Sequence, residues 1–170
     1  MTIANCHAVS TVDASSSRLI LYYHRRTEPG RVLTVDRLLS GALGRDPQAP
    51  GGLVVLANCV TDLAVARYDE SVTLATAVLA AGACSVVGSK WAIADQPQTT
   101  VLMFMFHHFL HDAGGESAGS PADALRAAQM WMLDPDRVTP DGADEAAFAR
   151  LEEKNLADPV FWAAFTHHGH

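Results

Sequence analysis

Two residues with complementary chemistry stand at the ends of short apolar runs. His7 follows the run 1–6, and Cys59 ends the run 53–59. Both runs are typical of buried parallel strands. A thiol with a pKa of about 8.5 is mostly protonated at neutral pH, so it needs a nearby base to become a nucleophile. Imidazole titrates at about 6.5 and suits that task, so the sequence predicts a Cys-His dyad.

The three cysteines have other interpretations that strand geometry helps to separate. Cys6 and His7 are consecutive on a strand, so they point to opposite faces, and we expect Cys6 in the core. The same alternation disfavours a metal site built from Cys6, His7 and Cys59. Cys84 begins another apolar run, and we expect it to be buried too. For Cys59 the alternative to a nucleophile is a small buried hydrophobic side chain.

Composition limits the classes of protein to consider. The chain has 170 residues, 49% of them hydrophobic, which favours one domain over residues 1–170 with a real core. Its net charge is −7 and it has no Lys/Arg cluster, so nucleic acid is not an expected ligand. The scattered cysteines are no disulfide framework, and no signal segment or membrane-spanning stretch is evident. We expect a cytoplasmic protein with no cofactor.

Strand and helix signals alternate along the chain, which is typical of an α/β fold with a mostly parallel sheet. Turn residues around Pro29 and Gly30 predict a hairpin, and Gly82 is placed to end a helix in the left-handed conformation. The predicted strands are 1–6, 18–23, 53–59, 84–89 and 160–165. The predicted helices begin near Thr34, Glu70, Asp95 and Ser120, and a further charged helix covers 146–154.

One of these helices carries a second group of polar residues with possible chemistry. His107 and His111 lie one helical turn apart and could present two imidazoles to zinc. The other interpretation is a solvated helix face, and we expect that one. No metal site is therefore predicted.

An ordered set of motifs resembles a known family. His7 follows its strand, and the other blocks come in order: LVVLANC at 53–59, DE at 69–70, AAGACSVVGSKW at 80–91, ADALRAAQ at 122–129 and FWAAF at 161–165. Together they are similar to the CHAT domain family of caspase-like predicted cysteine peptidases. The resemblance runs over nearly the whole chain.

This resemblance implies a fold, an activity and a catalytic pair. It implies a caspase-like three-layer α/β/α sandwich and hydrolysis of a peptide or protein substrate. The residues that match the catalytic pair are His7 and Cys59. Their order agrees with the caspase pattern, in which the histidine lies about 50 residues upstream of the cysteine. The backbone N–H groups of Ala8 and Cys59 are then candidates for the oxyanion hole.

Three departures from the family pattern bear on the site. Ala8 stands where the family usually has glycine, which narrows the allowed backbone angles but keeps the N–H donor. Val-Thr-Asp at 60–62 replaces a common Glu-Thr-Gly run. The chain also begins only a few residues before His7, where the family domain has further elements. We therefore expect an N-terminally truncated domain whose first strand has an unpaired edge for a protein partner.

Several residues near the predicted strand ends could contact substrate. Trp91 and Asp95 could line the cleft, although an aromatic plug and a helix cap explain them equally well. Asp62 is close to Cys59 in sequence and could select a basic side chain, or it could cap a loop. We expect a cysteine endopeptidase that cleaves after a basic residue. The alternative is a non-catalytic protein-interaction module with the same fold.

Overall fold

The computed structural model divides the chain into two compact units, each described here by itself. The first comprises Met1–Ala92 and Phe165–His170, and the second comprises Ile93–Ala164. The structure describes residues 2–3, 7–9, 18–21, 31–42, 51–57, 73–93, 96–112, 119–141, 143, 148, 151 and 155–170.

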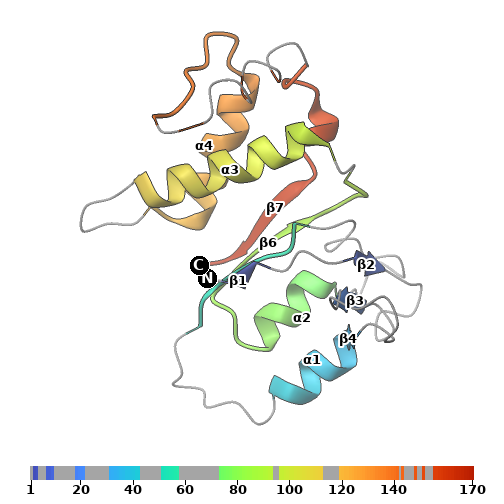
Figure 1. Cartoon of the computed structure of the whole chain (residues 1–170). Helices are drawn as coiled ribbons and strands as arrows, with labels where there is room; N and C mark the ends of the chain where they lie inside the picture. Colours follow the sequence, from blue (N-terminus) through green and yellow to red (C-terminus); the bar gives the residue numbers. More distant parts are fainter. Residues whose placement is uncertain are drawn as a thin grey trace. The chain divides into compact units, whose positions relative to one another are not determined.

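A four-stranded sheet forms the centre of the first unit. Its strands lie in the order β1 (Thr2–Ile3), β5 (Leu53–Val55), β6 (Ser85–Ser89) and β7 (Phe165–Gly169) (Figure 1). β1, β5 and β6 are parallel to one another, as the sequence predicts. β7 is antiparallel to β6. The register pairs Ile3 with Val55 and Val55 with Val87. The parallel part of the sheet therefore brings together three segments that are far apart in sequence.

The first unit also contains a smaller antiparallel sheet. Its strands are β2 (His7–Val9), β3 (Arg18–Leu21) and β4 (Arg31–Thr34), in that order. His7 pairs with Ile20, and β3 and β4 form the predicted hairpin. His7 is thus the first residue of a strand in this second sheet.

Two helices of the first unit begin at side chains that cap them. In α1 (Val35–Ala42) the hydroxyl of Thr34 accepts a hydrogen bond from the N–H of Arg37 at 3.2 Å, as predicted. In α2 (Leu74–Ala80) the Thr73 hydroxyl accepts from the N–H of Thr76, and the Thr76 hydroxyl accepts from the N–H of Thr73. The predicted start of this helix near Glu70 lies outside the described residues. Gly82, with φ 100°, follows its end as predicted.

A single buried cluster joins these helices to both sheets. α1 packs on α2 and β4, and α2 packs on β6 and β7. The members of the cluster come from four elements and the segment after β5: Leu19, Val35, Leu56, Leu74, Ala75, Ala77, Val78 and Val86. Burial of these apolar side chains is what holds the small sheet against the central one.

The second unit is helical in the part that the structure describes. α3 (Pro97–Asp112) packs on α4 (Pro121–Leu133), and Ser120 caps α4 as predicted. The segment after α4 folds back on it, because Trp131 donates from its indole N–H to the carbonyl of Val138 at 2.9 Å. Phe148 packs edge-on against Trp131, and Phe148 and Leu151, within the predicted charged helix, are buried and helical.

Two predictions about the local structure are wrong. The predicted strand 160–165 is instead a 3₁₀ helix, Pro159–Phe161, followed by β7. The side chain of Asp158 caps this short helix, and Pro159 fits its first position because it needs no N–H there. Cys84, predicted to be buried, is exposed; it directly precedes β6, and its N–H donates to the carbonyl of Gly52 at 3.1 Å.

The fold class is mixed α/β, as predicted. The central sheet contains both parallel and antiparallel pairs, and the small sheet is antiparallel. Within the described ranges no helix has the length and apolar character needed to cross a membrane.

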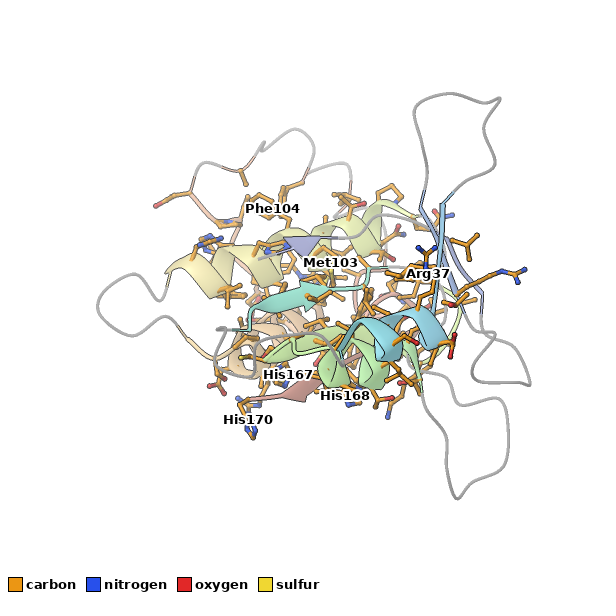
Figure 2. The ribbon with its side chains drawn as sticks, turned by 90° about the horizontal axis from the view of Figure 1, so that it is seen from below. Arg37, Met103, Phe104, His167, His168 and His170 are labelled. Atoms are coloured by element: carbon orange, nitrogen blue, oxygen red, sulfur yellow. The ribbon has the colours of Figure 1, made fainter. Side chains whose placement is uncertain are left out.

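A buried hydroxyl ties β7 to β6. Ser85 is 2% exposed, and its O–H donates to the carbonyl of His170. The same oxygen lies 2.9 Å from Nε2 of His167, so that nitrogen carries the proton and donates to it. His167 and His168 lie in β7, and His170 follows its end; all three side chains are labelled in Figure 2. The polar network thus fixes the register at the end of β7.

Replacement of Gly169 by alanine is predicted to destabilise the fold. Its φ is 99°, and a Cβ would collide with the carbonyl oxygen of Cys84. We expect Gly169→Ala to lower the free energy of unfolding by about 1–3 kcal/mol, measured by urea denaturation. The matched control is Gly52→Ala, because a Cβ there has nothing within 4 Å. Similar losses in the two variants would contradict the argument.

Acidification is expected to destabilise the fold through His167. Burial, and to a smaller extent the nearby His168, lowers the pKa of His167 from its ordinary value of 6.5. The unfolded chain therefore binds this proton at higher pH than the native chain, and stability falls as the pH drops below about 6.5. His167→Gln keeps an N–H donor for Ser85 but removes the titration. Urea unfolding at about pH 7.5 and about pH 5.5 should show a smaller loss in this variant than in the wild type. An equal loss would overturn the assignment.

Candidate functional site

The candidate site lies where the parallel strands of the central sheet end. β1, β5 and β6 run in one direction, so their carboxyl ends share one edge of the sheet. In open α/β sheets this edge is where ligands bind. The residues that follow these ends in sequence are His7 after β1, Cys59 after β5 and Trp91 after β6.

The register between β1 and β5 aligns the two segments that lead to the predicted dyad. Ile3 pairs with Val55, and the ladder between β5 and β6 continues to Leu56, whose N–H donates to the carbonyl of Val87 at 2.8 Å. His7 is four residues after Ile3, and Cys59 is four residues after Val55. Cys59 lies outside the described residues, and for His7 the structure describes the backbone.

The backbone after His7 belongs to the edge strand of the small sheet. Ala8 pairs with Leu19, and Leu19 is 2% exposed. Leu19 and Leu56 belong to the same buried cluster. The partner of Ala8 and the last buried residue described before Cys59 therefore share one core, which restricts the distance between β2 and the end of β5.

The end of β6 supplies the residues on the other side of this edge. Ser89 is fully buried, whereas Lys90 and Trp91 are exposed, with 39% of Trp91 accessible. Trp91 is therefore not fully buried, and part of its side chain is available to a ligand. Asp95, the predicted helix cap or cleft residue, lies outside the described residues, as does Asp62.

Sequence reasoning missed a buried polar side chain in the first turn of α3. Gln98 is 7% exposed, and its Oε1 atom has no hydrogen-bond partner in the described part of the chain. A glutamine in a first helical turn is usually solvated, so its type and position carry no signal of burial. Only the packing of this turn distinguishes it.

No three His, Cys, Asp or Glu among the described residues lie together as metal ligands would. On α3, burial and the neighbouring His111 lower the pKa of His107, so this imidazole is neutral at neutral pH. His107, His108, His111 and Phe104 line one concavity of about 320 Å³.

Comparison with known proteins identifies the family. The family model described as the CHAT domain matches residues 4–170. That range contains His7, Ala8, Cys59 and Trp91, and it includes residues of both compact units. A search of curated proteins found no match. Because the match covers nearly the whole chain, the protein belongs to the CHAT domain family, a caspase-like peptidase family.

Proposed function

We propose that this protein is a cysteine endopeptidase in which Cys59 is the nucleophile and His7 is its base. The observation that carries the proposal is the β1–β5 register. Ile3 and Val55 are paired, and both His7 and Cys59 come four residues later. Segments that leave the same sheet edge after equal lengths can bring a thiol and an imidazole within hydrogen-bond reach.

The membership in a caspase-like peptidase family supports the same pair, because the family model covers both residues. The shared core supports it further. Leu19, which pairs with Ala8, and Leu56, which precedes Cys59, are both buried in the same cluster. This packing restrains the two chain segments on which the proposed dyad depends.

The proposed reaction is an acyl transfer in two steps. The Cys59 thiolate attacks the peptide carbonyl, so an S–C bond forms and the C–N bond breaks, while the imidazolium of His7 gives its proton to the leaving amine. Water then hydrolyses the thioester, with His7 accepting a proton from it. The backbone N–H groups of Ala8 and Cys59 would stabilise the oxyanion.

The proposed substrate is a peptide or protein cleaved after a basic residue. Asp62, Asp69 and Asp95 supply the acidic side chains close in sequence to the strand ends. A carboxylate can accept two parallel hydrogen bonds from a guanidinium group. The exposed indole of Trp91 offers a surface on which the substrate chain could pack.

We also propose a protein partner at the outer edge of β1. This strand is at one end of the strand order of the central sheet in the part that the structure describes. Such an edge presents backbone N–H and C=O groups to which an extended segment of another chain can pair. Pairing there would lie beside the strand that leads to His7.

Cys59 is predicted to react fastest of the cysteines with iodoacetamide below neutral pH. A thiol paired with a histidine has a lowered pKa, so a larger fraction is thiolate. Peptide mapping by mass spectrometry after timed alkylation measures each rate. Cys84 is the matched control, because it is an exposed thiol outside the proposed dyad. His7→Ala should slow Cys59 at least about tenfold and leave Cys84 unchanged. Equal rates at the two thiols, unaffected by His7→Ala, would argue against the dyad.

Cleavage is predicted to follow arginine or lysine. A fluorogenic peptide library varied at the cleaved position measures this preference, with Cys59→Ser as the inactive control. Asp62→Asn should lower kcat/KM for arginine substrates by about 10- to 100-fold while affecting neutral substrates less. Turnover after aspartate alone would refute the acidic pocket. A lack of turnover for every peptide, with Cys59 unreactive towards peptide electrophiles, would refute the peptidase.

A further inference from the structure

Four rings form one face of α3 in the second unit. Phe104, His107, His108 and His111 are spaced so that they fall on one side of the helix, and they line the concavity of about 320 Å³. Phe104, labelled in Figure 2, belongs to α3, and 42% of it is exposed. His111 is exposed, while His107 and His108 are half-buried. The face is therefore open to a small ligand.

His107 and His111 are one helical turn apart on α3, and both line the same concavity. Metal ions bind the neutral form of imidazole, so two neighbouring rings can hold one cation.

One ring nitrogen of His107 lacks a hydrogen-bond partner among the described residues. Nδ1 of His107 is buried and has no hydrogen-bond partner in the part of the chain that the structure describes. An unpaired buried polar atom costs about 1–3 kcal/mol. In native proteins such an atom commonly points to a functional role, or to a bound water or ion nearby.

We propose that His107 and His111 bind a divalent transition-metal ion across one turn of α3, with Phe104 and His108 as the walls of the site. Residues four apart on a helix have Cβ atoms about 5–6 Å apart, and helical metal motifs use this His pair to hold zinc. Imidazole suits zinc, nickel and copper, whereas magnesium and calcium prefer oxygen ligands. Because the described residues provide no group of three ligands, water completes the coordination.

The proposal is independent of the peptidase, because its residues lie on α3 and not on the strands that lead to His7 and Cys59. It predicts selectivity as well as binding. Copper should bind more tightly than nickel or zinc, following the usual order for nitrogen ligands, and magnesium should not compete. A site built from carboxylates would instead accept magnesium or calcium.

The test uses the full chain without an affinity tag, titrated with zinc chloride by calorimetry. One zinc ion per chain should bind at the site, and magnesium should not displace it. His111→Gln should weaken binding by at least about tenfold, as loss of a coordinating group does. His111 is exposed, so this variant should fold, which circular dichroism checks. His170→Gln is the matched control, because it removes an exposed imidazole outside α3, directly after β7, and should leave zinc affinity unchanged.

Cysteines also bind zinc, so a second readout separates them from the histidines. Cobalt bound by imidazoles shows no thiolate-to-metal charge-transfer absorption, whereas cobalt at Cys59 or Cys84 would show it. The site is supported if the spectrum of bound cobalt lacks that band, disappears in His111→Gln and persists in His170→Gln. A thiolate band, wild-type affinity in His111→Gln, or no zinc binding would overturn it.

Discussion

The parallel pairing of β1 with β5 is the interaction on which the proposed site depends. Its register, Thr2 with Val54 and Ile3 with Val55, aligns two segments that are separated by the whole small sheet and α1. A shift of one residue would exchange the faces of every side chain on β1 and change the lengths that lead to His7 and Cys59. Since parallel pairs need crossover connections, this alignment is set by packing between distant parts of the chain and not by a tight turn.

The shared core explains how that register is maintained. α2 begins at a capping box on Thr73 and buries Leu74, Ala77 and Val78. These side chains meet Val86 from the central sheet and Leu19 from the small one in a single cluster. Because the core is close-packed, displacing β3 would open a void beside Leu19. Stability and the position of the backbone at Ala8 are therefore linked through the same apolar contacts.

The buried polar side chains of this fold differ in whether their atoms have hydrogen-bond partners. Ser85 is buried because its hydroxyl has partners in His167 and His170, so the fold compensates its desolvation. His107 and Gln98 each keep a buried atom without a partner in the described residues. Such atoms destabilise a fold unless something else interacts with them, and residue type alone does not reveal them. The unpartnered Nδ1 of His107 belongs to the second site that we propose on α3.

The sequence by itself determined the elements whose signals are local. Local sequence signals predicted the Thr34 and Ser120 caps, the glycine after α2, and the apolar runs that contain β5 and β6. The ordered motifs resembled the CHAT domain family, and the family model confirms it. Tertiary structure alone decided the rest. Aromatic residues at 160–165 are compatible with a strand, but the Asp158 cap makes 159–161 a 3₁₀ helix. Cys84 belongs to an apolar run, yet β6 begins only at Ser85 and the cysteine is exposed. The pairing of Ile3 with Val55 likewise depends on contacts between residues far apart in sequence, which no local pattern encodes.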